Sequence, residues 1–145
     1  MVVGMDMAEP RSVTEIRTKA NTSLINVTVL GIYRWHDGRV YDGQFSEDKR
    51  HGQGIFRWPD GAVYDGEFNN GQRQGHGKYT FADGGHYEGT WKDGRYDGFG
   101  TCTWEVGRRY RGKWRNGIPH GQGVETYPNG TVRHEGQWVD DEPIR

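Results

Sequence analysis

The sequence has a single cysteine, few branched aliphatic residues and no long apolar run. The one cysteine, Cys102, excludes an internal disulfide framework and a cysteine-rich zinc site. Two acids, Asp6 and Glu9, lie in the first ten residues, which is unlike a secretory signal. The most apolar stretch, 24–30, is interrupted by polar residues and is far shorter than a membrane span. We therefore expect a cytoplasmic protein, with association to the cytoskeleton or to a membrane left open.

A chain this poor in aliphatic residues must build its core from other side chains. Only 32% of the residues are hydrophobic, a level also found in disordered chains. However, the net charge is only −1, aromatic residues make up 13% of the chain, and the 24 glycines are regularly spaced. Since each aromatic ring buries roughly 150–250 Å², the 145 residues are predicted to form one folded domain with an aromatic core.

A pentapeptide of aromatic residue, glycine and second aromatic residue recurs every 23 residues. It begins at Tyr41, Tyr64, Tyr87 and Tyr110, and a degenerate copy begins at His134. A glycine pair, a third aromatic residue and a turn glycine follow with the same period. This periodicity predicts an array in which each repeat is one supersecondary unit.

Each repeat has the pattern of a β-hairpin. Alternating residues form the first strand, and Asn70-Gly71, Asp93-Gly94 and Asn116-Gly117 mark tight turns. Glu47-Asp48 lacks glycine, so this turn is expected to differ, and Val106 replaces the aspartate of another turn. The fold class predicted is all-β, an elongated antiparallel meander of about ten strands, about 43 Å long at roughly 4.8 Å per strand.

The same pattern divides the chain into segments. The predicted segments are a leader over 1–23, a repeat array over 24–139 and a tail over 140–145. The array is divided into a half unit at 31–40, full units at 41–63, 64–86, 87–109 and 110–133, and a partial unit at 134–139.

Strand alternation places both aromatic residues and the middle glycine of each pentapeptide on one face. The glycine removes a side chain where rings must pack closely. We expect some rings to remain exposed in a groove and to anchor a partner protein. The residues predicted to form this aromatic face are Tyr33, Trp35, Tyr41, Phe45, Trp58, Tyr64, Phe68, Phe81, Tyr87, Trp91, Trp104, Tyr110 and Trp114.

The opposite face is basic in the fourth unit, where Arg109, Arg111, Lys113 and Arg115 alternate with the ring-face residues. The first two units carry neutral or acidic residues at these positions. Two interpretations stay open: a solvated face, or a site for an acidic partner or anionic lipid headgroups.

The leader has the spacing of a helix capping box at Ser12–Glu15. A short helix over 13–20 is predicted as a cap for the open edge of the first hairpin. A disordered tail is the alternative.

Motifs for catalysis or metal binding are not found. The segment 71–78 fails the spacing of a phosphate-binding loop. The six histidines show no ligand pair, and a polar turn role explains His51 and His120, which share a repeat position. No catalytic residue, cofactor or metal is therefore predicted.

The repeat "YDGEFNNGQRQGHGKYTFADG", which begins at Tyr64, resembles the MORN (membrane occupation and recognition nexus) repeat. The resemblance implies a curved array of hairpins acting as a non-enzymatic scaffold or adaptor for protein partners. It also leaves open a regulatory module of a phosphatidylinositol phosphate kinase or a SET-type lysine methyltransferase, or direct binding of anionic phospholipid. No nucleic-acid partner is expected, and a homodimer remains an open alternative.

Overall fold

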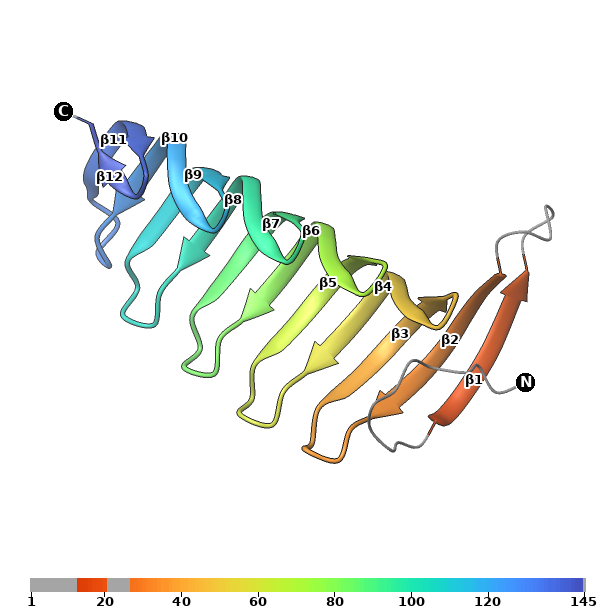
Figure 1. Cartoon of the computed structure of the whole chain (residues 1–145). Helices are drawn as coiled ribbons and strands as arrows, with labels where there is room; N and C mark the ends of the chain where they lie inside the picture. The colour runs from red at the N-terminus through yellow and green to blue at the C-terminus, as the bar shows by residue number, and fades with distance from the viewer. Residues whose placement is uncertain (1–12, 21–26, 145) are drawn as a thin grey trace.

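The computed structural model describes residues 13–20 and 27–144, and all regular elements in these two ranges are β-strands. The strands are β1 (Val13–Ala20), β2 (Val27–Arg34), β3 (Val40–Ser46), β4 (Lys49–Arg57), β5 (Val63–Asn69), β6 (Gln72–Thr80), β7 (His86–Lys92), β8 (Arg95–Thr103), β9 (Arg109–Arg115), β10 (Ile118–Thr126), β11 (Val132–Val139) and β12 (Glu142–Pro143). They form one sheet in sequence order, which confirms the predicted all-β meander (Figure 1). In the same ranges, no helix is present that is long and apolar enough to cross a membrane.

Two-residue turns connect the strands of the five hairpins from β3–β4 to β11–β12. Asn70 and Gly71, between β5 and β6, have φ angles of 50° and 88°, and positive φ at both positions is typical of a type I′ turn. The expectation that Glu47-Asp48 differs is wrong, because φ angles of 51° and 65° give the same backbone form. The pairing of β3 with β4 imposes this form although glycine is absent. Asp140 and Asp141 repeat it before β12, within the predicted tail.

The connections between hairpins are closed by backbone and side-chain hydrogen bonds. After β4, the Trp58 amide donates to the Ala62 carbonyl at 3.0 Å, and the Ala62 amide donates to Oδ1 of Asp60 at 2.9 Å. After β8, Val106 stands where the other connections have an aspartate or asparagine. The Trp104 amide still donates to the Arg108 carbonyl at 2.9 Å, so the backbone closes the turn without the side-chain acceptor.

Each repeated tyrosine folds over a pair of facing glycines. Gly43 and Gly54 pair across β3 and β4, and the hydroxyl of Tyr41 donates to the Gln44 carbonyl at 2.7 Å. A Cβ atom on Gly54 would lie 2.3 Å from the Tyr41 hydroxyl oxygen, closer than real Cβ contacts. The predicted packing role of the glycines is therefore confirmed.

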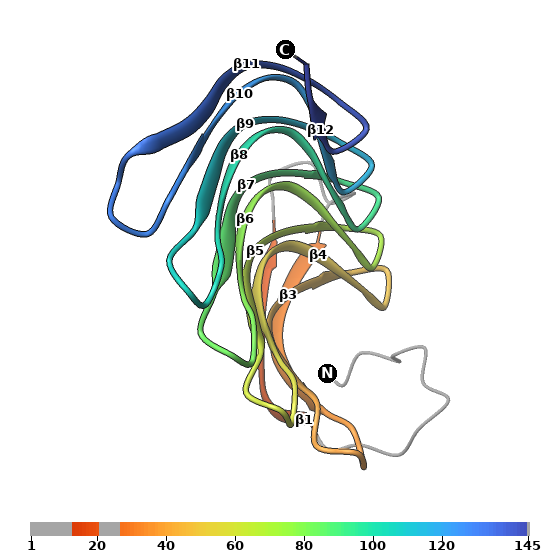
Figure 2. The same cartoon turned by 90° about the vertical axis from the view of Figure 1, so that its left-hand side faces the viewer.

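The hairpins curl, and this gives a single-layer sheet an inside. The register shifts between Gly43 and Phe45, opposite a segment of β4 that contains Gly52 at a φ of 80°. Such an irregularity bends a strand, and it recurs in the later hairpins. Figure 2 shows the resulting arches stacked along the array. We call the side with the repeated rings the ring face and the opposite side the outer face.

Residues 13–20 form a strand, so the predicted helix is wrong. β1 pairs antiparallel with β2, from Ala20 opposite Val27 to Val13 opposite Tyr33. A helix of two turns is marginal in water, whereas the edge of β2 offers backbone partners along its length. The segment still covers the first edge of the repeat array, as a strand. Ser12, the first residue of the expected capping box, lies outside the described residues.

Candidate functional site

Most of the predicted aromatic face forms the core. The rings buried there to 6% exposure or less are Tyr33, Tyr41, Phe45, Tyr64, Phe68, Tyr87, Trp91, Tyr110 and Trp114. Neighbouring units interlock edge to face, as in the contact of Tyr64 with Trp91, whose ring centroids lie 5.2 Å apart. These nine residues stabilise the array and are too buried to contact a partner. Fewer of the predicted residues are therefore available for binding than the sequence indicated.

The other four predicted rings are only partly buried and form an aromatic row, one per unit: Trp35, Trp58, Phe81 and Trp104. Phe56 bridges Trp35 and Trp58 with centroid distances of 5.3 and 4.4 Å. Tyr79 similarly bridges Trp58 and Phe81, at 5.3 and 5.4 Å. The bridging position is then occupied by Cys102, so the stack stops before Trp104. The first part of the array therefore presents a continuous aromatic strip.

Three depressions beside the aromatic row form a groove along the ring face. The first, of about 270 Å³, and the middle one, of about 420 Å³, share Arg50 and Gly71. The middle one and the third, of about 340 Å³, share Arg73 and Gly94. Two equivalent arginines therefore partition a continuous track that crosses the strands.

The two arginines are held by rings and by the next turn. The Arg50 guanidinium carbon lies 5.2 Å from the centroid of Phe56, and Nη2 donates to the Gly71 carbonyl at 2.9 Å. Arg73 lies 4.9 Å from the Trp91 centroid and donates to the Gly94 carbonyl at 3.1 Å. Burial is the main reason why the pKa of Arg50 is lowered. Stacked in this way, each guanidinium has a fixed plane.

Sequence reasoning missed Arg50 and Arg73. The available signal was an arginine at one repeat position in two consecutive units, followed by Tyr96 and Pro119 in the next two. Tyr96 takes over the packing role, since its ring stacks on Tyr87 with centroids 3.8 Å apart. Guanidiniums stacked in this way are therefore confined to the first half of the array.

A buried carboxylate replaces a ring near the C-terminal end. Glu125 is only 2% exposed and lies at the repeat position of Phe56, Tyr79 and Cys102. Its two oxygens accept from Nη1 of Arg108 at 2.8 Å and from Nη1 of Arg133 at 2.6 Å. The Arg108 guanidinium also lies 4.0 Å from the Trp104 centroid. This cluster lies beyond the end of the aromatic strip and links the start of β9, the end of β10 and the start of β11.

The predicted basic residues Arg109, Arg111, Lys113 and Arg115 are all exposed on the outer face of β9. Phe99, which is 52% exposed, pairs with Lys113 across β8 and β9. The depression there has a volume of about 470 Å³ and is lined by Phe99, Arg109 and Arg111. Arg115 has an acidic neighbour, Asp140, at 3.6 Å, which the sequence pattern did not suggest.

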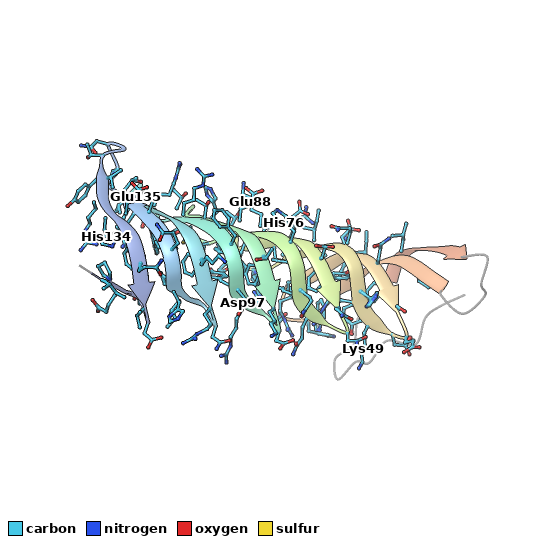
Figure 3. The ribbon with its side chains drawn as sticks, turned by 90° about the horizontal axis from the view of Figure 1, so that it is seen from above. Lys49, His76, Glu88, Asp97, His134 and Glu135 are labelled. Atoms are coloured by element: carbon cyan, nitrogen blue, oxygen red, sulfur yellow. The ribbon has the colours of Figure 1, made fainter. Side chains whose placement is uncertain are left out.

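The rest of the outer face carries charges of both signs. Figure 3 shows His76, Glu88 and Glu135 along one side of the array and Lys49, which borders the groove, on the opposite side. His76 Nε2 lies 3.9 Å from Oε2 of Glu88, and both side chains are exposed. The basic strand is thus a local feature of a mixed surface.

Several polar and reactive groups have packing roles. His51 Nδ1 accepts from the Asn70 amide at 3.4 Å, and His120 Nδ1 accepts from the Asp140 amide at 3.2 Å. Burial raises the pKa of the Cys102 thiol to about 12, so this sulfur is protonated near neutral pH. In the described ranges, no three His, Cys, Asp or Glu residues are placed to hold a metal ion.

Comparison with known proteins agrees with the repeat boundaries. The family model described as the MORN repeat matches residues 41–63, 64–86, 87–107 and 110–132, more than half of the chain. No curated protein matches the sequence.

Proposed function

The chain belongs to the MORN repeat family, and on this premise we propose that it is a non-enzymatic scaffold or adaptor that binds a protein partner along its ring face. The observation that carries the proposal is the continuous aromatic strip beside a groove that spans several units. Repeat arrays bind extended partners through one contact row per unit. Half-exposed tryptophan side chains are common anchors in interfaces.

Affinity purification with the full chain tests this proposal. Trp58→Ser combined with Phe81→Ser removes two anchors from the aromatic row. Arg57→Ser combined with Thr80→Ser changes the residues that precede them, which lie on the other side of strands β4 and β6. Captured proteins should be lost with the first variant and kept with the second, with both variants shown to be folded by circular dichroism. Equal capture by the two variants would contradict binding at the ring face.

A second candidate function is binding of an acidic surface or of anionic lipid by the basic strand β9. It is supported by the four exposed cations and by the half-exposed Phe99 beside them. Each Lys or Arg near an anionic membrane contributes about 1 kcal/mol, so four are enough for weak, salt-dependent attachment. A role as the regulatory module of an enzyme would use the same two faces.

A further inference from the structure

The groove on the ring face is cationic as well as aromatic, and we infer that its ligand is an acidic segment in the polyproline II conformation with carboxylates three residues apart. This inference rests on the proposed function and specifies the partner's chemistry.

The middle of the groove has an excess of positive charge. The middle depression is lined by Arg39, Arg50, Arg73 and Arg95, with Asp93 as its carboxylate. Arg39 is already paired with Asp37, at 2.8 Å. In the part of the chain that the structure describes, no ion pair joins Arg50, Arg73 or Arg95 to an acid. A partner that supplies carboxylates would complement this excess.

The two stacked arginines of the groove have hydrogen-bond donors to spare. A guanidinium has five N–H donors. Arg50 and Arg73 each use one of them to donate a hydrogen bond to a turn carbonyl. No other hydrogen bond of the two guanidiniums is present in the described ranges, so their remaining Nη N–H groups are available to a partner, although the Nε of Arg50 is itself buried. Since the rings already fix both guanidinium planes, little side-chain freedom is lost when a carboxylate binds.

The distance between the two stacked arginines matches the repeat of a polyproline II helix. Arg50 and Arg73 lie on β4 and β6, two strands apart, which corresponds to roughly 9.6 Å. A polyproline II helix has three residues per turn and a rise of about 3.1 Å, so residues i and i+3 lie on one side about 9.3 Å apart. A β-strand alternates faces and repeats at about 6.8 or 13.6 Å, which does not match. The aromatic row has the same one-per-unit spacing, and aromatic grooves are common docking sites for proline-rich segments.

Fluorescence anisotropy with labelled peptides and the full chain tests the inference. The probe is (Glu-Pro-Ala)4; the controls are (Lys-Pro-Ala)4 and a peptide of the same composition in which no two glutamates are three apart. We expect binding of the probe alone, weakened by salt and reduced about tenfold for each arginine lost. Equal binding of the rearranged peptide, or no binding of the probe, would overturn the inference.

The protein variants separate the groove from general electrostatics. Arg50→Gln with Arg73→Gln should remove binding, whereas Arg109→Gln with Arg111→Gln removes the same charge from the outer face and should keep it. Arg95 is an exposed side chain at the rim of the groove, so Arg95→Gln should weaken peptide binding without affecting the fold. This single variant tests the inference even where the double groove variant is unstable. If the probe fails while partner capture still depends on Trp58 and Phe81, the proposed function stands and this inference falls.

Discussion

Gly89 and Gly100 face each other across β7 and β8 so closely that a Cβ atom on Gly89 would lie 2.4 Å from the Cα of Gly100. The same Cβ would lie 2.7 Å from the hydroxyl oxygen of Tyr87, which donates to the Thr90 carbonyl at 2.8 Å. The glycine pair thus makes room for the tyrosine, and the tyrosine covers the bend of its own hairpin. This relationship recurs in each full unit and explains the repeated pentapeptide.

Gly89→Val should lower the free energy of unfolding by about 3 kcal/mol or more, at the upper end of overpacking costs, because the clashing atoms belong to backbone. Urea unfolding measures the effect. The control is Glu88→Val, which places the same side chain on the exposed outer face and should change stability by about 0.5 kcal/mol or less. Thr90 is unsuitable as a control because its hydroxyl donates to the Asp97 carbonyl. Similar losses in both variants would contradict the assignment of faces.

Val106→Asp should stabilise the protein by about 0.5–1.5 kcal/mol, because it adds the acceptor that Asp60 supplies in an earlier turn. Val106 is 71% exposed, so little apolar burial is lost. The reciprocal change, Asp60→Val, should destabilise by a similar amount. Thermal melts of the two variants check the pair, and a neutral result for both would show that backbone bonds alone determine these turns.

Replacing both arginines around Glu125, by Arg108→Met and Arg133→Met, should lower the free energy of unfolding by about 3 kcal/mol, because the carboxylate would stay buried without a partner. Adding Glu125→Leu to the Arg108→Met and Arg133→Met variant should recover most of this loss. The cation–π contact with Trp104 is missing from both variants, so the comparison isolates the carboxylate. Stability that does not recover in the triple variant would mean that the arginines act mainly through packing.

Stability should fall as the pH rises through about 9–12. Burial raises the pKa of Tyr110 to about 12 and that of Cys102 to about 12, and it raises the pKa of Tyr41, Tyr64 and Tyr87 above their ordinary value. The unfolded chain releases these protons at lower pH than the folded chain, so its smaller proton count favours unfolding in this range.

Each such group contributes up to about 1.4 kcal/mol per pH unit, and the contribution is fully present below the pKa values of the unfolded chain. Denaturant titrations from neutral to alkaline pH measure the slope, which Tyr87→Phe should reduce. A flat profile up to pH 12 would contradict the burial of the tyrosine hydroxyls.

Changing Arg109, Arg111, Lys113 and Arg115 to serine tests the basic strand. The variant should lose any binding to phosphatidylserine vesicles, while its melting temperature should change little because the four side chains are exposed. Sedimentation with vesicles at low and physiological salt measures the binding. If the variant sediments with vesicles as well as the unchanged protein does, β9 is not the lipid-binding surface and its cations only face solvent.

The strands of the repeats, their faces and the Asn-Gly and Asp-Gly turns could be predicted because each depends on local spacing. A period of 23 residues, alternation and Asn-Gly pairs are visible in the sequence. Which rings are fully buried and which stay partly exposed was not predictable in the same way. It depends on the bend at Gly52 and its equivalents, and this bend closes the ring face over residues such as Tyr41 and Phe45.

The cationic groove was missed because its parts come from different units. Arg50 reaches the turn glycine Gly71, which is 21 residues later in the sequence. Only the stacking of one hairpin on the next brings the guanidinium, the turn and the rings together. β1 was missed because the capping-box spacing indicated that a helix would cover this edge, whereas the unpaired backbone groups of β2 are satisfied by a strand.

Binding of a protein partner at the ring face is tested most directly by site-specific photo-crosslinking in the full chain within cells. A benzophenone amino acid replaces Trp58 in the aromatic row in one sample and Lys78, exposed on the outer face, in the other. We predict a discrete crosslinked partner from position 58 and little or none from position 78. Crosslinks that are as strong or stronger from position 78 would contradict partner binding through the ring face.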